Sequence, residues 1–237
     1  MARAEQKFVL FGTGGAKTIV DEKTKNLDAL AEKIARASLD YPIGCLASKA
    51  CLIEESIYEP LKKLLIEKFS NIKAGDPLSE VSEIGYYQDL PEVLGLINEA
   101  VRFNLVKVIN KKGISANGNY QPAEPILLEA FDVDSEFLRD EYSVPILTLY
   151  KYKGIDEGIK ILNEISHLNS EKKLSLAVSV YSDRINDIKE KLFQINAYHI
   201  NINEPTTVMN FALPHHGRYL TDHLTREITI NWTNKRK

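Results

Sequence analysis

Short apolar or β-branched runs alternate with segments of helical periodicity along most of this chain, and this alternation constrains the fold more than any other feature. Apolar residues recur at helical spacing in five segments, which begin near Leu27, Ile57, Leu90, Ile155 and Ile185. Strands that alternate with helices form a mostly parallel sheet covered on both faces. We therefore predict an α/β fold with a doubly wound, mostly parallel sheet.

The runs between the helices predict the strands of this sheet. They are expected over residues 8–10, 17–20, 50–53, 106–109, 126–128, 145–149, 176–180 and 198–202. Asn26 stands before the first helix, where its side chain can accept a backbone N–H bond as a cap. Ser56 with Glu59 three residues later predicts a capping box for the second helix. The turn formers in residues 111–122 predict an exposed loop.

The length of 237 residues supports one domain, and it allows a sizeable core to be buried. We predict a single domain over residues 1–237. Within it, residues 204–237 are expected to form an irregular segment, a C-terminal strand and a basic tail, because this part has little apolar periodicity before Thr225.

Composition narrows the setting. The net charge is −3, and the only basic cluster is the tail Lys235–Lys237, so neither a nucleic-acid binder nor a membrane-surface binder is expected. No apolar run approaches the roughly 18 residues of a spanning helix, and the N-terminus lacks the apolar core of a signal peptide. The two cysteines make no disulfide framework. These features predict a cytoplasmic protein.

Two motifs carry the chemistry. Residues 11–15 read Phe-Gly-Thr-Gly-Gly, and Cys45 follows in Gly-Cys-Leu-Ala at residues 44–47, ahead of an apolar strand and a helix. Further on, residues 75–77 read Gly-Asp-Pro and residues 140–146 read Asp-Glu-Tyr-Ser-Val-Pro-Ile. In this order the chain resembles the catalytic domain of the aldehyde dehydrogenase superfamily. It looks like a short, stand-alone relative without the NAD-binding domain.

The resemblance implies roles for individual residues. Cys45 matches the nucleophile, and Glu141 matches the glutamate that contacts the nicotinamide ribose. Gly12, however, stands where the family carries its general-base glutamate, and Ala50 stands where an arginine is usual. Because the glycine pair follows Met1 within about a dozen residues, we expect no room for a cofactor domain. The resemblance therefore implies a vestigial thiol, a vestigial Glu141 and no bound cofactor.

Each of these residues also has a structural interpretation. Cys45 is expected to be inherited and non-catalytic, with Lys49 the nearest cation in sequence that could activate it. Cys51 lies in an apolar strand and is interpreted as a small core residue. Glu141 is expected at the surface or locally hydrogen-bonded. The glycines at 12, 14 and 15 favour close backbone approach or positive φ over a phosphate site.

No metal site is expected. His215, His216 and His223 lie near Asp222, but adjacent strand residues point to opposite faces and no ligand framework surrounds them. They are interpreted as solvent-exposed loop residues.

The preferred hypothesis is a pseudoenzyme: a catalytically inactive domain, not an enzyme, that serves as a structural or protein-interaction module in a larger assembly, possibly of the cytoskeleton. A protein partner or a second copy would bind through the C-terminal strand, where Ile228, Ile230 and Trp232 alternate with polar residues. The face that a missing cofactor domain leaves bare is a second candidate surface.

Two alternatives stay open. Cys45 alone would serve a thiol-dependent aldehyde- or acyl-binding or redox protein. A separate NAD-binding chain would complete a dehydrogenase in trans.

Overall fold

The structure is a computed structural model, and it describes residues 14–110, 123–166 and 174–208, together with Asn210, Pro214 and Tyr219. The described residues up to Val208 belong to one compact unit. The predicted strands over residues 8–10 and 225–232 and the predicted loop over residues 111–122 lie outside the described part. The single domain over residues 1–237, with its last segment over residues 204–237, stays a prediction.

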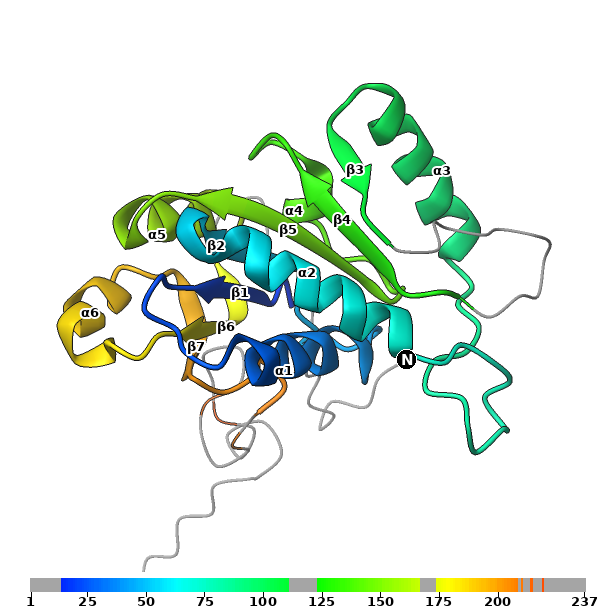
Figure 1. The fold of residues 1–237 in the computed structure, drawn as a ribbon, viewed down its shortest axis with the longest axis horizontal. Coiled ribbons are helices and arrows are strands. Elements are labelled where there is room, and N and C mark those ends of the chain that lie inside the picture. The colour runs from blue at the N-terminus through cyan, green and yellow to red at the C-terminus, as the bar shows by residue number, and fades with distance from the viewer. Residues whose placement is uncertain are drawn as a thin grey trace, which may run out of the picture. The chain divides into compact units, whose positions relative to one another are not determined.

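Within the described residues a seven-stranded sheet has the order β3-β4-β5-β2-β1-β6-β7 (Figure 1). The strands are β1 Lys17–Val20, β2 Ala50–Glu54, β3 Val106–Val108, β4 Ile126–Ala130, β5 Ile146–Tyr152, β6 Ser175–Tyr181 and β7 Ala197–Ile202. All neighbouring pairs are parallel except β3 and β4, which are antiparallel. The predicted α/β fold with a mostly parallel sheet is confirmed.

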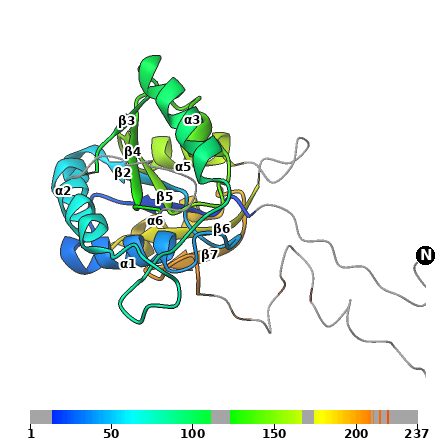
Figure 2. The ribbon, with the colours of Figure 1, turned by 90° about the vertical axis from the view of Figure 1, so that its right-hand side faces the viewer.

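Helices cover both faces of this sheet (Figure 2). They are α1 Leu27–Leu39, α2 Glu55–Asn71, α3 Leu90–Arg102, α4 Glu136–Arg139, α5 Ile155–Glu164 and α6 Ile185–Leu192. Neighbouring residues of a strand point to opposite faces. Ile19 accordingly packs into the hydrophobic cluster of α3, α4, α5 and α6, whereas Val20 packs into the cluster of α1 and α2. Strands buried on both faces explain the nearly continuous apolar runs in the sequence.

The two predicted helix starts have different outcomes. Asn26 caps α1 as predicted, because its side-chain oxygen accepts a bond from the N–H of Ala29 at 3.3 Å. The capping box at Ser56 is wrong. Since β2 runs directly into α2, Glu54 is the capping residue, and its carboxylate accepts the N–H of Ser56 at 2.8 Å. Ser56 is therefore already inside the first turn.

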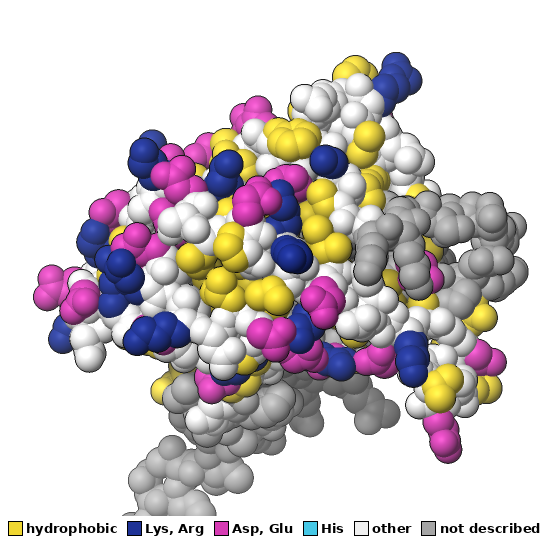
Figure 3. Space-filling model, in the orientation of Figure 1, with side chains coloured by type: hydrophobic (Ala, Val, Ile, Leu, Met, Phe, Trp, Pro, Cys, Tyr) yellow, Lys and Arg dark blue, Asp and Glu magenta, His cyan; other side chains and the backbone are white. Residues whose placement is uncertain are grey.

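The distribution of charge is visible on the face that Figure 3 displays. Lysine and arginine side chains are interspersed there with aspartate and glutamate, and neither sign is concentrated (Figure 3). Among the described residues, no helix is both long enough and apolar enough to cross a membrane. The cytoplasmic setting itself stays a prediction.

Candidate functional site

The thiol of Cys45 lies in the loop between α1 and β2, at the amino ends of the central strands. Two tight turns shape the loop, because Gly44 N–H donates to the carbonyl of Tyr41 and Ala47 N–H donates to the carbonyl of Gly44, each at 2.9 Å. The side chain of Cys45 is half-buried. Part of the residue therefore remains accessible to solvent.

Gly14, just before β1, packs directly against this loop. A Cβ atom built on Gly14 would stand 1.7 Å from the carbonyl oxygen of Cys45, so only glycine fits there. Gly15 has φ of 56°, in the left-handed region that favours glycine. The predicted close approach and positive φ at the glycine pair are thus confirmed. Gly12, the position matched to the general base, lies outside the described residues.

Glu141 reaches the same glycines from the segment between α4 and β5. Its Oε2 atom accepts the N–H of Gly14 at 2.5 Å and the N–H of Gly15 at 3.4 Å. These bonds join residues more than 120 positions apart, so the expectation of a surface or locally bonded Glu141 was wrong. Because β1, β2 and β5 are parallel, the residues that precede them lie together at the amino ends of these strands. A half-buried carboxylate and the thiol loop therefore meet across Gly14.

Two buried lysines complete this cluster. Lys17 and Lys49 are 0% and 1% exposed. The ammonium of Lys17 donates to the carbonyl of Arg139 at 3.3 Å, and that of Lys49 donates to the carbonyls of Pro42 and Val144. Lys49 thus ties the thiol loop to the segment that carries Glu141.

Burial lowers the pKa of each lysine to about 8. The negative charge of Glu141 opposes this effect at both lysines, which shows that its carboxylate lies within electrostatic range of both ammonium groups. Buried ammonium groups require such a partner. The sequence indicated Lys49 only by proximity and Lys17 not at all, although a lysine that opens a buried strand is an unusual feature.

The environment holds the thiol of Cys45 in its protonated form. Burial raises its pKa, and the charge of Glu141 raises it further, whereas the backbone N–H of Cys45 itself opposes both effects. Cys51 is fully buried in β2, as predicted, and burial raises the pKa of its thiol as well. Of the two thiols, only Cys45 is accessible to chemistry.

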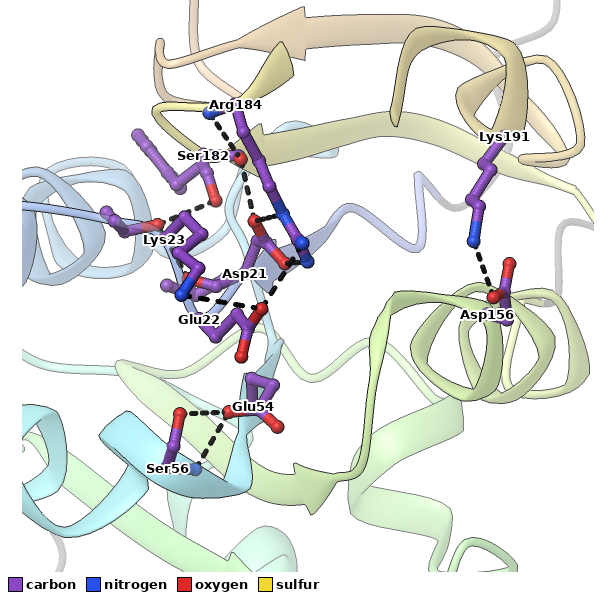
Figure 4. Close-up of polar contacts among 12 residues, drawn as sticks. Asp21, Glu22, Lys23, Glu54, Ser56, Asp156, Ser182, Arg184 and Lys191 are labelled. Carbon is purple, nitrogen blue, oxygen red and sulfur yellow. Dashed lines mark hydrogen bonds and ion pairs between the residues drawn. The ribbon is translucent and has the colours of Figure 1, made fainter. Parts of the chain in front are cut away.

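A second polar cluster, which the sequence interpretation missed, lies at the carboxyl ends of the central strands (Figure 4). The guanidinium of Arg184 donates to both carboxylate oxygens of Asp21, at 2.7 and 2.8 Å, and Ser182 donates to one of them at 2.8 Å. Asp21 follows β1 and Arg184 follows β6, where the chain connections diverge to opposite sides of the sheet. Doubly wound sheets often bind ligands at this point.

Here that point is filled by protein groups. The side chain of Asp21 is completely buried. Although burial alone would raise its pKa, the bonds from Arg184 and Ser182 outweigh burial and hold the pKa below its usual value. The cluster is satisfied internally, so we interpret it as a structural connection between β1 and β6.

Several predicted residues lie outside the described part of the chain. They are Gly12, His215, His216, Asp222, His223, Ile228, Ile230 and Trp232. The interaction strand therefore stays a prediction. Among the described residues, no group of three His, Cys, Asp or Glu side chains is placed to hold a metal ion.

Comparison with known proteins identifies the family. The model of the aldehyde dehydrogenase family matches residues 1–221, which is nearly the whole chain. The chain belongs to the aldehyde dehydrogenase family. Among curated relatives, it is 28% identical to sulfoacetaldehyde dehydrogenase of Neptuniibacter caesariensis over 64% of this chain and 31% of the relative. It is 22% identical to α-ketoglutaric semialdehyde dehydrogenase of Bacillus subtilis (strain 168), over 90% of this chain and 44% of the relative.

Solved structures show the same fold. The NADP-dependent glyceraldehyde-3-phosphate dehydrogenase of Bacillus halodurans C-125, complexed with NADP, superposes with a TM-score of 0.73 at 18% identity. The match covers 86% of this chain and 40% of that one. An NAD-dependent aldehyde dehydrogenase from Sinorhizobium meliloti gives a TM-score of 0.72 at 20% identity, over 86% of this chain and 39% of that one. This chain thus spans less than half the length of these aldehyde dehydrogenases.

These comparisons correct one expectation. The sequence was interpreted as a pseudoenzyme with a structural role, but the family, the relatives and the structural neighbours are enzymes. The statement that the chain is not an enzyme is therefore contradicted. That expectation rested on which chemical groups stand at the matching positions of the sequence. The fold, however, brings a carboxylate that is distant in sequence, Glu141, to the thiol loop.

Proposed function

We propose that this aldehyde dehydrogenase family chain is the nucleophile-bearing part of an enzyme that captures aldehydes on Cys45. The observation that carries the proposal is the site itself. The backbone of Cys45, whose side chain is half-buried, packs against Gly14, the carboxylate of Glu141 binds the N–H of Gly14, and two buried ammonium groups bind the adjoining segments. Catalytic groups with perturbed pKa values tend to gather in this way.

The first step needs only this chain. The sulfur of Cys45 adds to the carbonyl carbon of the aldehyde, a carbon–sulfur bond forms, and the thiol proton ends on the carbonyl oxygen. No electron transfer is involved, and the product is a thiohemiacetal. The backbone N–H of Cys45 lowers the pKa of its own thiol, so it favours negative charge on the attacking sulfur.

The described residues do not fit the dinucleotide that the family implies. Glu141 matches the ribose-binding glutamate, yet its carboxylate is engaged with the amides of Gly14 and Gly15. We therefore derive no hydride-transfer step. The second part of the proposal is that a separate chain supplies the dinucleotide site. It is supported by the NADP-bound structural neighbour, because the match covers only 40% of that protein's chain.

The relatives suggest suitable probes. Both are named for aldehydes that carry an acidic group, sulfoacetaldehyde and α-ketoglutaric semialdehyde. The test measures iodoacetamide labelling of Cys45 by peptide mass spectrometry, with increasing succinic semialdehyde or with butanal, a neutral aldehyde with the same number of carbons. We expect saturable protection of Cys45, stronger with the acidic aldehyde.

The matched control is the Cys45→Ala variant, in which native-state labelling should be absent because Cys51 is buried. Labelling of Cys45 that stays unchanged up to millimolar concentrations of both aldehydes would refute aldehyde capture.

A further inference from the structure

The structure places a carboxylate at Gly14, two residues along the chain from the position where the sequence lacks one. Gly12, at the position matched to the general base, has no side chain that can accept a proton. Two residues later, Gly14 separates two groups: its N–H binds the Glu141 carboxylate at 2.5 Å, and its Cα packs on the backbone of Cys45. Glu141 and Cys45 therefore flank the same glycine.

The carboxylate is held in this place by the segment that carries it. Lys17 binds the carbonyl of Arg139, two residues before Glu141, and Lys49 binds the carbonyl of Val144, three residues after it. Lys49 also binds the carbonyl of Pro42 in the thiol loop. The two buried ammonium groups thus fix the backbone on both sides of Glu141 and connect it to the loop of Cys45.

We propose that Glu141 is the general base that activates water for hydrolysis of an acyl group carried on Cys45. This inference rests on the proposed function, because it requires Cys45 to act as a nucleophile. A side chain that accepts a proton from attacking water typically contributes about a hundred- to ten-thousand-fold to the rate. Glu141 is the carboxylate whose charge acts on the thiol of Cys45, and it is bound at Gly14, whereas Asp140 acts on Lys17.

The step balances without an oxidant or reductant. Water gives a proton to the Glu141 carboxylate while its oxygen bonds to the carbonyl carbon of the thioester. The carbon–sulfur bond then breaks, the carboxylic acid leaves, and the departing sulfur of Cys45 recovers the proton from Glu141. The raised pKa of the thiol fits this order, because a carboxylate nearby favours the protonated sulfur once the product has left.

The same geometry predicts opposite effects on the two half-reactions. Replacing Glu141 by glutamine removes a negative charge beside the thiol, so the thiolate fraction at pH 7 should rise and acylation should become as fast or faster. Loss of the base should slow deacylation. A residue that only supports the fold would slow both half-reactions together.

The test uses p-nitrophenyl acetate, which acylates a thiol and releases p-nitrophenolate without any cofactor. The wild-type chain should show a burst of p-nitrophenolate followed by steady turnover. In Glu141→Gln the burst should persist, turnover should fall about a hundredfold or more, and mass spectrometry should find the acetyl group accumulated on Cys45.

The matched control is Glu129→Gln, since Glu129 is also a partly buried carboxylate, bonded to Tyr58 and Lys62 away from the thiol. Its burst and turnover should match those of the wild type. A Glu141→Asp variant, which withdraws the carboxylate by one methylene, should give intermediate turnover, and urea unfolding should show that all variants are folded.

The outcomes separate the two proposals. Turnover of Glu141→Gln within about threefold of wild type, or equal losses of burst and turnover, would overturn the role of Glu141 while leaving Cys45 as the nucleophile. A burst that survives in the Cys45→Ala variant would instead overturn the proposed function and this inference with it. The absence of a burst in the wild-type chain would do the same.

Discussion

Gly14 and Cys45 are in direct backbone contact, although 30 residues separate them. The place where a Cβ of residue 14 would lie is 1.7 Å from the carbonyl oxygen of Cys45 and 2.4 Å from its carbonyl carbon. Backbone atoms cannot move away as a flexible side chain can. The position of the thiol relative to β1 therefore depends on the missing side chain at Gly14.

Gly14→Ala should consequently displace the loop of Cys45. We expect a loss of about 1–3 kcal/mol in the free energy of unfolding, typical of overpacking, and a clear loss of Cys45 acylation by p-nitrophenyl acetate. Gly95→Ala is the control, because Gly95 is exposed in α3 and a Cβ there meets no atom within 4 Å. It should gain about 0.5–1 kcal/mol, as expected for alanine in a helix. Equal behaviour of the two variants would contradict this packing argument.

The pKa of Cys45 gives a second prediction. Since burial and Glu141 both raise it, iodoacetamide labelling of Cys45 should reach half its maximal rate above the ordinary thiol value of about pH 8.5. The charge of Glu141 also affects the pKa values of the neighbouring Lys17 and Lys49, and the charge of Asp140 affects that of Lys17.

Glu141→Gln should shift this midpoint downward, because it removes the nearest negative charge. Labelling rates from pH 6 to 10, followed on the Cys45 peptide, measure the shift. A midpoint at or below 8.5 in the wild type, or an upward shift in the variant, is the result that this electrostatic picture cannot accommodate.

The sequence predicted most of the sheet because hydrophobic periodicity depends on burial, and each central strand is buried on both faces. The predicted strand over residues 17–20 has the same bounds as β1, and the helix after Asn26 matches α1. The four-residue helix α4 was not predicted, because it is shorter than one period of the apolar pattern can reveal. Its structural role is to position Arg139 and the segment that leads to Glu141.

The site was predictable only in part. Cys45 and Glu141 were both recognised by their motifs, but their approach across Gly14 depends on the register of parallel strands, which no local pattern encodes. For the same reason Lys17 appeared to be an ordinary strand residue. The burial of the Lys17 ammonium can be recognised only once the fold has brought together the segments that surround it.

Lys17 leads to a third prediction, on pH-dependent stability. Its pKa is about 8 in the folded chain and about 10.5 when unfolded, so between these values the unfolded chain binds more protons. The contribution of Lys17 to stability therefore rises as pH increases through this window. Relative to Lys17→Met, the wild type should gain on the order of 1–2 kcal/mol between pH 7.5 and 9.5.

Urea unfolding of both proteins at the two pH values gives this difference directly. Lys153→Met is the control, since the side chain of Lys153 is 80% exposed, and its difference from wild type should hardly change with pH. If the Lys17→Met difference is equally flat, the ammonium of Lys17 is not desolvated as described.

The assembly prediction concerns the C-terminal strand. β7 is the last strand of the described sheet, and Tyr198 and Ile202 on it are 41% and 44% exposed. We expect deletion of residues 225–237, which removes Ile228, Ile230 and Trp232, to lower the oligomeric mass measured by light scattering. A triple change of these three residues to serine, which keeps the chain length, should have the same effect. An unchanged mass in both variants would exclude this strand as the contact.

The ion pair between Asp21 and Arg184 gives the last prediction. The buried carboxylate of Asp21 accepts hydrogen bonds from Arg184 and Ser182, whereas Arg184 is 29% exposed and keeps a second ion pair with Glu22. Asp21→Asn should therefore cost about 1.5–3 kcal/mol at pH 7, as expected for loss of hydrogen bonds to a charged group. Asp156→Asn, which breaks the exposed pair with Lys191, should cost less than about 1 kcal/mol.

The pH dependence of that cost identifies its cause. The folded pKa of Asp21 lies below its unfolded value of about 3.9, so the carboxylate stabilises the fold above that pH and loses its contribution as pH falls through the folded pKa. The gap between wild type and Asp21→Asn should therefore narrow steadily in urea titrations from pH 5 toward pH 2. A gap of constant size would show that Asp21 acts through packing. The difference in unfolding free energy between the two proteins would then be the same whether Asp21 is charged or protonated.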